Sequence, residues 1–287
     1  MVDISVWITT YNHELFIAQA IESVLMQQTT FTYELVIGED CSTDRTRDIV
    51  LNYKAKYPEK ISLFLPEKNI GMIPMAWATY KFCTGRYVAW LDGDDYWLDP
   101  HKLQKQVSFL ENNPAFSFCF HKVKLQVEYN LYISRDPLME RDDDTLSFRD
   151  FIRINNPVHA LSVVHRNILS EYLPSWVFSL PYPDLGLYFV FCGYGEAKFM
   201  RDVMGTYRIH DNGAYSGESR YHNLNKALFF FKLIKKVISK EYVPDVNRMI
   251  KYHRRELIKV MVDNSKMLRA LRAVKREILH TLKPVFK

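Results

Sequence analysis

Three carboxylates lie within four positions of the segment WLDGDDYW. They belong to Asp92, Asp94 and Asp95, and Gly93 separates the first two. Like charges at this spacing repel one another unless a cation is present. Carboxylate oxygens are ligands that Mg²⁺ and Mn²⁺ share with phosphate oxygens, and a glycine lets the backbone approach a ligand closely. The segment therefore predicts a Mn²⁺ or Mg²⁺ site with Asp94 and Asp95 as ligands, and a solvated acidic turn is the alternative.

Apolar, β-branched runs predict the strands that must position these carboxylates. The runs cover residues 4–10, 34–40, 61–66 and 87–95. Segments with helical spacing follow each run, and Ser42 or Thr43 is the expected N-cap of the second helix. Strands that alternate with helices predict an α/β fold, in which a mostly parallel, Rossmann-like sheet is flanked by helices.

The carboxyl ends of these strands carry further polar residues. Thr9 and Tyr11 follow the first strand, and Asp40 follows the second. Ligands of parallel sheets bind beyond this edge. Asp40 can accept a hydrogen bond from a base or a ribose, and Tyr11 can stack on a base. Taken singly, each is more often a turn residue, so the prediction of a nucleotide site depends on the strand ends being neighbours.

These segments resemble the family 2 glycosyltransferases, which have the GT-A nucleotide-sugar-binding fold. The resemblance covers residues 4–111 in order and spacing. It depends on the segments ISVWITTYNHE, ELVIGEDCSTDRTRDIV, PEKNIG and GRYVAWLDGDDYWLDPHKLQKQVSFLE. Two positions depart from the family pattern, because Cys41 stands where many members carry Gly and Glu39 where many carry Asp.

The resemblance implies an inverting, metal-dependent hexosyltransferase. Such an enzyme moves a sugar from a nucleotide-sugar donor to a hydroxyl of a glycan or a lipid-linked glycan, in cell-surface polysaccharide or lipopolysaccharide synthesis. UDP is the commonest nucleotide in this family, although no residue here distinguishes UDP from GDP or dTDP. By resemblance, the nucleoside and the diphosphate are held by Thr9, Tyr11, Asp40, Asp92, Gly93 and Arg208.

The second half of the chain resembles the family more weakly. NPVHALSVVHRNIL (156–169) is similar to the segment that faces the acceptor. PYPDLGLYFVFCGYGEAKF (181–199) is similar to the helix that begins at the catalytic carboxylate, which assigns that role to Asp184; a helix N-cap is the alternative. GTYRIHDNGAYS (205–216) is similar to the segment that closes over the diphosphate, and it offers His210 as a metal ligand beside Arg208.

Two other classes of function are compatible with an acidic nucleotide site. A sugar-nucleotide nucleotidyltransferase would usually have a Gly-rich loop with Lys or Arg after the first strand, to hold a triphosphate. Here that loop is TTYNHELF, which has neither. A non-catalytic glycan-binding module is the third alternative, and the presence of Asp94, Asp184 and His210 argues against it.

The charge of the chain is unevenly distributed. Residues 226–287 contain 17 Lys+Arg and 5 Asp+Glu, a balance of +12, whereas the preceding residues carry −7. We expect a catalytic domain over 1–220, with a nucleotide-sugar-binding half (1–112) and an acceptor-side half (113–220). A basic helical appendage over 221–287 would follow it. Basic amphipathic helices can bind an anionic membrane surface or pack on the protein with their charges solvated. Packing is favoured for residues 229–237, and both alternatives stay open for 266–287.

The cysteines and the N-terminal residues indicate the cellular compartment of the protein. The four cysteines show no CxxC spacing, which predicts reduced thiols in a cytosolic compartment. MVDISVWITTYN has no basic start before a long apolar run, so no signal peptide is expected. We therefore expect a cytoplasmic protein, on the inner face of the membrane if the C-terminal helices bind lipid, without a nucleic-acid partner.

Overall fold

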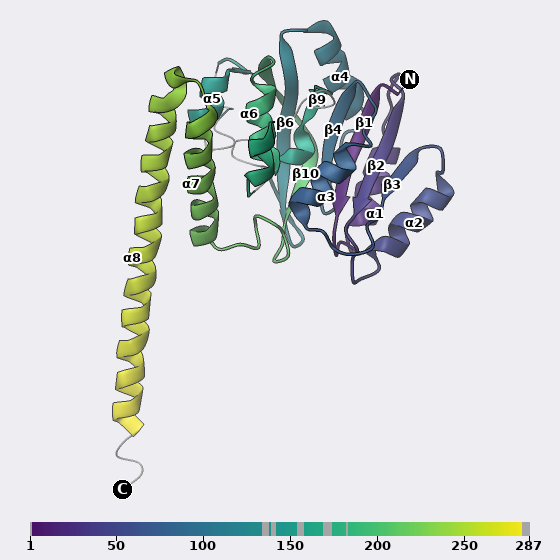
Figure 1. Cartoon of the computed structure of the whole chain (residues 1–287). Coiled ribbons are helices and arrows are strands. Elements are labelled where there is room, and N and C mark those ends of the chain that lie inside the picture. The colour runs from purple at the N-terminus through teal and green to yellow at the C-terminus, as the bar shows by residue number, and fades with distance from the viewer. Residues whose placement is uncertain are drawn as a thin grey trace. The chain divides into compact units, whose positions relative to one another are not determined.

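The computed structural model describes residues 2–133, 138, 142–153, 158–168, 174–181 and 183–282. The chain forms two compact units, Met1–Gly213 and Ala214–Lys287. The first unit is built on a sheet, and the second consists of helices (Figure 1).

The described part of the first unit contains a ten-stranded sheet in the order β3-β2-β1-β4-β9-β6-β10-β5, with β7 beside β6 and β8 beside β10. Its strands are β1 (Ile4–Thr10), β2 (Tyr33–Glu39), β3 (Ile61–Phe64), β4 (Tyr87–Asp92), β5 (Tyr96–Trp97), β6 (Phe116–Val127), β7 (Asn130–Ile133), β8 (Thr145–Leu146), β9 (Val164–Arg166) and β10 (Glu196–Ile209). Its helices are α1 (Ile17–Leu25), α2 (Thr46–Lys56), α3 (Met72–Tyr80), α4 (Lys102–Asn112), α5 (Phe148–Arg153) and α6 (Pro183–Phe191), with 3₁₀ turns at Ala160–Ser162 and Ser175–Ser179.

The predicted fold class is confirmed, and the parallel part of the sheet is its N-terminal half. β3, β2, β1 and β4 run parallel. Beyond β4 the sheet is mixed, because β9 runs antiparallel to both β4 and β6, whereas β6 and β10 are parallel. The 3₁₀ turn at Ala160–Ser162 leads directly into β9. Residues 156, 157 and 169 of the predicted acceptor-facing segment lie outside the described residues.

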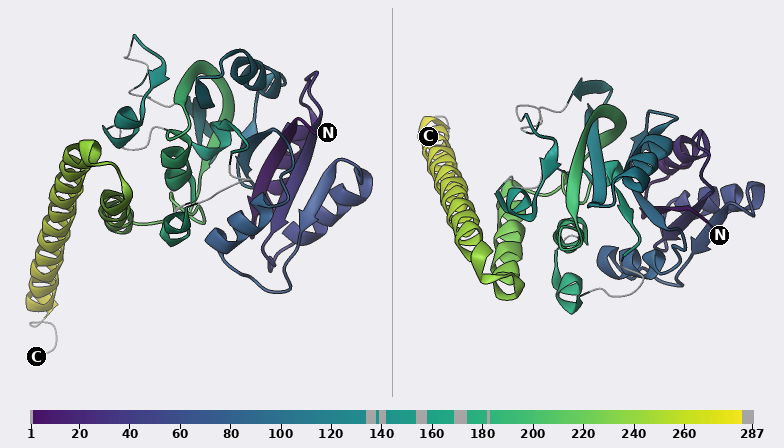
Figure 2. Two further views of the ribbon diagram at one scale, coloured as in Figure 1. Left: turned by 45° about the horizontal axis from the view of Figure 1, so that its top comes forward. Right: turned by 90° about the horizontal axis from the view of Figure 1, so that it is seen from above.

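Helices cover both faces of the sheet (Figures 1 and 2). Successive side chains of a strand point to opposite faces. In β1, Val6 and Ile8 therefore join the apolar core that includes residues of α1, α2 and α4. Trp7 points the other way, and its ring lies 6.3 Å from that of Trp77 and 5.1 Å from that of Tyr80 on α3. The side chains of Val6, Trp7 and Ile8 are all fully buried. Because β1 pairs with β2 on one side and with β4 on the other, it lies inside the parallel part of the sheet.

The register of the parallel strands brings their carboxyl ends to one edge. Thr9 of β1 pairs with Gly38 on one side and with Asp92 on the other. The backbone N–H of Asp40 donates to the carbonyl of Thr10 at 3.0 Å. The polar residues predicted at three strand ends are therefore neighbours in space.

The start of α2 differs from the prediction. Arg45 precedes the helix and makes no side-chain cap. Asp44 accepts a hydrogen bond from the Thr46 N–H at 2.9 Å. Ser42 instead accepts from the Asn12 N–H, also at 2.9 Å. The prediction of a Ser42 or Thr43 cap was wrong because contacts between the loops, which sequence spacing does not show, engage these residues.

The second unit consists mainly of α7 (Arg220–Val237) and α8 (Val243–Leu282), joined through a 3₁₀ turn at Lys240–Tyr242. The Ser219 hydroxyl caps α7 by accepting from the His222 N–H. Pro244 lies in the first turn of α8, where a missing N–H costs least. Phe231 and His253 pack between the two helices with ring centroids 5.2 Å apart.

The structure also bears on the cysteines and on contact with a membrane. All four cysteines are free thiols in the structure. In the described part of the chain, no helix combines the length and apolar character needed to cross a membrane. For residues 266–287, the side chains lie outside the described part, so the two alternatives for this segment stay open.

Candidate active site

The acidic loop follows β4 directly and is held by two strands. The Gly93 N–H donates to the carbonyl of Thr9 at 3.0 Å, and the Asp95 N–H closes a turn on the Asp92 carbonyl at 3.1 Å. A side chain at Gly93 would come within 2.6 Å of the Thr10 hydroxyl. The sequence predicted that the absence of a side chain at Gly93 would make room for a ligand. In the structure, the Thr10 side chain occupies that space.

Pairing of β5 with β10 brings the end of β10 to this loop. Gly205 and Thr206 pair with Trp97 and Tyr96. As a result, the Arg208 N–H donates to Asp95 Oδ1 at 2.8 Å. Residues more than 110 positions apart in the sequence form one site through this antiparallel contact.

Asp94 lies between two imidazoles. Its Oδ2 is 3.1 Å from Nε2 of His210 and 3.8 Å from Nε2 of His13. Burial alone would raise the pKa of Asp94, but the hydrogen bond with His210 and the charges of both imidazoles lower it below its usual value. Asp94 is therefore held as a carboxylate. Burial lowers the pKa of His13, although the charge of Asp94 opposes this effect.

Arg208 covers the acidic loop. Its guanidinium donates to the Asp94 carbonyl and to Gln19 Oε1. It also lies over two rings, 4.4 Å from the centroid of Tyr96 and 5.1 Å from that of Phe16. Stacking and hydrogen bonds fix the position of this cation, which suits it to a diphosphate.

The other two carboxylates of the loop are in a different electrostatic state. Burial and the charge of Asp94 raise the pKa of Asp92 to about 8. Burial and the charges of both neighbours raise the pKa of Asp95 well above its usual range. Asp95 is also almost inaccessible to solvent. A bound cation would reverse this repulsion and allow all three groups to ionise.

Asp184 lies in the first turn of α6 and acts on the same group of carboxylates. Its charge contributes to the raised pKa of Asp92, and also to those of Tyr188 and Tyr207. Electrostatic interaction of this kind requires proximity, so the fold brings Asp184 to the acidic loop from a sequence distance of about 90 residues.

The described residues contain no group of three or more His, Cys, Asp or Glu side chains arranged to hold a metal ion. Asp94 and His210 nevertheless present an oxygen and a nitrogen next to each other. Mg²⁺ and similar ions at nucleotide sites use one or two protein ligands and take the remaining positions from phosphate and water. The pair fits such an ion. Asp95 fits less well, because it is buried and accepts from the Arg208 backbone.

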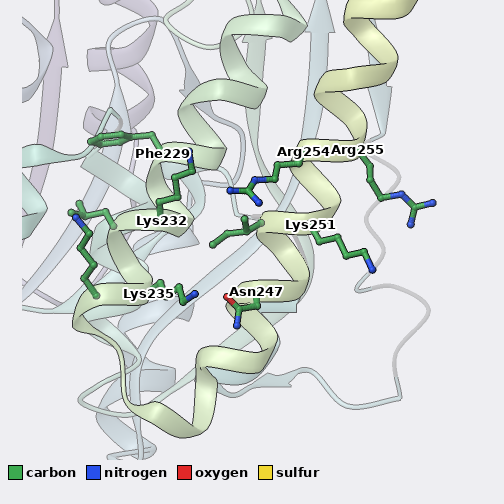
Figure 3. Close-up of a pocket in the computed structure, with 10 residues that line it drawn as sticks. Phe229, Lys232, Lys235, Asn247, Lys251, Arg254 and Arg255 are labelled. Atoms are coloured by element: carbon green, nitrogen blue, oxygen red, sulfur yellow. The ribbon is translucent and has the colours of Figure 1, made fainter.

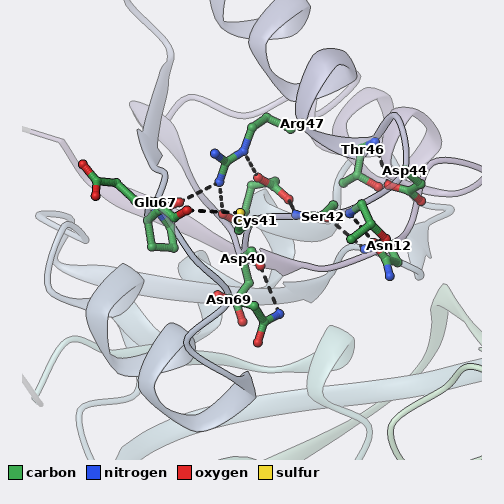
Figure 4. Close-up of polar contacts among 12 residues, drawn as sticks. Asn12, Asp40, Cys41, Ser42, Asp44, Thr46, Arg47, Glu67 and Asn69 are labelled. Carbon is green, nitrogen blue, oxygen red and sulfur yellow. Dashed lines mark hydrogen bonds and ion pairs between the residues drawn. The ribbon is translucent and has the colours of Figure 1, made fainter.

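The loops after β1, β2 and β3 form a second polar region at this edge (Figure 4). Both carboxylate oxygens of Asp40 accept backbone hydrogen bonds, from Ile70 at 2.8 Å and from Gly71 at 2.9 Å. Asn12 joins the other two loops, since its Oδ1 accepts from the Thr43 N–H at 2.9 Å. Tyr11 is 41% exposed. This arrangement leaves Tyr11 open for stacking, whereas Asp40 is buried and both of its oxygens are engaged by the backbone.

The two departures from the family pattern have structural consequences. Glu39 is fully buried, and its longer side chain reaches both the Arg47 guanidinium and the Ser42 N–H. Cys41 has φ +56°, in the left-handed region that favours glycine. Glu39 therefore gains an ion pair, whereas Cys41 carries backbone strain.

Replacing Cys41 with Gly is expected to increase the free energy of unfolding by up to about 1 kcal/mol. Relief of the left-handed strain, about 1–2 kcal/mol, exceeds the added entropy of glycine in the unfolded chain. Little else is lost, because Sγ makes only a 3.5 Å contact with the Glu67 carbonyl. Urea denaturation measures the change. Ser42→Gly is the matched control and should destabilise, since it removes the contact with Asn12; a less stable Cys41→Gly would contradict the argument.

Three side chains of the site were not predicted as functional. His13, Phe16 and Gln19 lie on the loop after β1 and on α1, and they contact Asp94, His210 and Arg208. The only indication in the sequence was the position of His13, two residues after Tyr11 at a strand end.

Comparison with known proteins identifies the family of the chain. The sequence profile of "Glycosyl transferase family 2" matches residues 5–173, more than half of the chain. The chain belongs to this family. Its relatives include an uncharacterized protein of Mycobacterium tuberculosis strain H37Rv, 33% identical over 210 residues, which are 72% of this chain and 58% of that protein. Another is TuaG of Bacillus subtilis, a putative teichuronic acid biosynthesis glycosyltransferase, 39% identical over 124 residues, which are 43% and 48% of the two chains.

Solved structures share the fold of this family 2 chain. S. aureus TarS 1–349, in complex with UDP-GlcNAc, aligns with a TM-score of 0.63 at 18% identity, over 87% of this chain and 70% of that one. The mannosyltransferase PcManGT from Pyrobaculum calidifontis, in complex with GDP-Man and Mn²⁺, aligns with a TM-score of 0.60 at 14% identity, over 94% and 79%. At these identities the similarity shows the GT-A fold alone. The chain spans 58% of the length of its mycobacterial relative.

Proposed function

We propose that this family 2 protein is an inverting glycosyltransferase that moves one sugar from a nucleotide-sugar to a hydroxyl of a glycan or lipid-linked glycan. The observation that carries the proposal is the contact of Asp94 with His210 beside the stacked Arg208. These groups lie at the edge where parallel sheets bind nucleotides. A metal-bound diphosphate requires a cation that binds its phosphates and a carboxylate that binds its metal. Arg208 and Asp94 would supply these two groups.

In this proposal the donor lies across the carboxyl edge of the sheet. Tyr11 stacks on the base, while Asp40 and Thr9 hold the nucleoside. Asp92 takes the ribose, and Asp94 with His210 holds Mn²⁺ or Mg²⁺ against the diphosphate. When bound, the ion stabilises the charge that develops on the leaving diphosphate. We assign the main ligand role to Asp94, since Asp95 is buried against β10.

The residues of the chain supply the remaining requirements of the reaction. Arg208 is fixed where it can neutralise the leaving group. Asp184 is the proposed general base, which takes the proton of the acceptor hydroxyl as its oxygen attacks the anomeric carbon. The bond from that carbon to the diphosphate oxygen breaks in the same step. Attack from the opposite face inverts the anomeric configuration.

Donor and acceptor are proposed from similarity. UDP is our first choice for the nucleotide, supported by the UDP-GlcNAc complex of TarS. A GDP-sugar is the alternative, supported by the GDP-Man complex of PcManGT. TuaG, a putative teichuronic acid biosynthesis enzyme, supports an acceptor in cell-surface polysaccharide synthesis.

One assay tests the transferase proposal against its two rivals. The protein is incubated with UDP-, GDP- and dTDP-sugars and Mn²⁺, with glycan acceptors, and released nucleoside diphosphate is measured. A transferase releases it in an acceptor-dependent manner. A nucleotidyltransferase would release no nucleoside diphosphate here, but would release pyrophosphate in a parallel reaction that contains a nucleoside triphosphate and a sugar phosphate. A glycan-binding module would release neither product, and either of these two results would overturn the proposal.

A further inference from the structure

A basic groove lies within the C-terminal unit, between α7 and α8 (Figure 3). It is lined by Phe229, Lys232, Leu233, Lys235, Lys236, Asn247, Ile250, Lys251, Arg254 and Arg255. Six of these side chains are cations and none is an acid. All six cations are exposed to solvent.

The six cations of the groove make no ion pair with the carboxylates of the described residues. The two acids of α8 nearest to them in sequence are already engaged. Asp245 lies 3.7 Å from Arg248, and Glu256 pairs with Arg220 at 2.7 Å and with Lys259 at 2.5 Å. Among the described residues, the charge of Arg255 acts on Glu256 and lowers its pKa, and most of the positive charge of the groove is left without a carboxylate partner.

Some of the charges share one space, whereas Lys251 and Arg255 extend away from α7 (Figure 3). In Figure 3, Lys232 from α7 and Arg254 from α8 project into the space between the two helices. Like charges that share one space repel each other, and an anion bound between them removes that repulsion. A purely solvated basic face would direct such side chains apart. The arrangement favours a phosphate-bearing ligand.

Exposed apolar side chains continue from the groove. Phe229 lines it and is 50% exposed. On α8, Ile258, Met261 and Val262 follow Arg254 and Arg255 at helical spacing, so they extend the same face. They are 60%, 53% and 43% exposed. A free phosphate needs no such apolar surface, and a nucleotide needs only one aromatic ring for its base, whereas a lipid headgroup layer with acyl chains beneath it matches both the charge and the extended apolar face.

We infer that this groove binds the headgroups of anionic lipids and attaches the C-terminal unit to an anionic membrane surface. The cations bind headgroup phosphates, while Phe229 and the apolar residues of α8 enter the headgroup boundary. This inference places the contact at residues 229–262 and goes beyond the proposed transfer reaction. A membrane contact here would retain the enzyme beside acceptors that are linked to lipid.

Vesicle sedimentation of the full chain tests the inference. Vesicles are made from phosphatidylcholine alone or with phosphatidylglycerol. The groove variant combines Lys232→Gln, Lys251→Gln and Arg254→Gln. Each basic residue near an anionic surface strengthens binding by about fivefold, so this variant should bind the anionic vesicles roughly a hundredfold more weakly. The wild type should pellet with anionic vesicles at low salt and remain in solution with neutral ones.

A matched control removes the same charge elsewhere. Lys56, Lys81 and Lys240 are exposed and lie outside the groove; their combined replacement by Gln should leave vesicle binding nearly unchanged. Equal binding of both triple variants would overturn the inference, because net charge alone would then explain it. Phe229→Ser should weaken vesicle binding without changing the affinity for inorganic phosphate. Tight phosphate binding without vesicle binding, or preference for a single-stranded oligonucleotide over vesicles, would also overturn it.

The same variants separate this inference from the proposed reaction. Release of nucleoside diphosphate with a soluble acceptor should be equal in the wild type and in both triple variants. If the wild type transfers sugar but does not bind anionic vesicles, only the inference about lipid binding is refuted. If no protein, including the wild type, transfers sugar, but the wild type still binds anionic vesicles, only the proposed reaction is refuted. Circular dichroism verifies that each variant is folded.

Discussion

Replacing Asp94 with Ala is expected to lower the rate of sugar transfer by about a hundredfold to a thousandfold. Asp94 is the carboxylate of the acidic loop whose pKa is lowered, and it contacts His210 at 3.1 Å. It is therefore the group best prepared to share a divalent ion with the diphosphate. Stabilisation of the leaving group by such an ion is worth several kcal/mol, which corresponds to this change in rate.

Binding of Mn²⁺ gives this prediction a second readout. In the presence of a nucleoside diphosphate, titration calorimetry should show Mn²⁺ binding to the wild type and much weaker binding to Asp94→Ala. Asp202→Ala is the matched control, because Asp202 is an exposed carboxylate on the same strand as Arg208 and pairs only with Lys105 in the described residues. It should keep both activity and Mn²⁺ binding. Full activity of the wild type in excess chelator would refute metal dependence.

The N-terminal half of the fold could be predicted from sequence because each strand is a compact apolar run. ISVWITT and YVAWLD are buried on both faces, and such runs predict neighbouring parallel strands. Once β1, β2 and β4 are parallel and adjacent, their polar ends must meet. The presence of Asp92 and Asp40 at one edge follows from this alone.

The second half was harder to predict because its pairing is not local. β9 is only three residues long and lies between two longer strands with which it runs antiparallel. β10 reaches the acidic loop through a two-residue partner, β5. Short contacts of this kind leave little periodic pattern in the sequence, so only the family resemblance indicated that Arg208 and His210 belong to the site.

The contacts of Asp94 show what remains hidden in a sequence even when the motif is recognised. Three acids within four positions predict a cation, but they do not indicate which one is ionised. That property depends on His13 and His210, which approach Asp94 from two different segments, and on the burial of Asp95 under β10. Burial and partners therefore assign distinct roles to chemically identical side chains.

Asp184→Asn is expected to lower the rate of transfer by about 10²–10⁴-fold, the usual contribution of a general base. The substitution keeps the size of the side chain and its place in the first turn of α6, but removes the proton acceptor. Donor affinity should be unchanged, since the proposed donor contacts come from the strand ends and from β10. Initial rates at saturating donor, combined with binding of the nucleoside diphosphate, separate the two effects.

Asp150→Asn provides the control for this second prediction, because Asp150 also lies in the first turn of a helix, α5, and accepts from the Ser147 N–H. Its replacement should alter stability without altering the pH dependence of transfer. Asp184→Asn should remove the rise of the rate with pH that deprotonation of a base produces. Its charge also raises the pKa of Asp92, so the variant should lower that pKa. Wild-type rates in Asp184→Asn would show that another carboxylate is the base. Asp92, which interacts electrostatically with Asp184, would be the first to test.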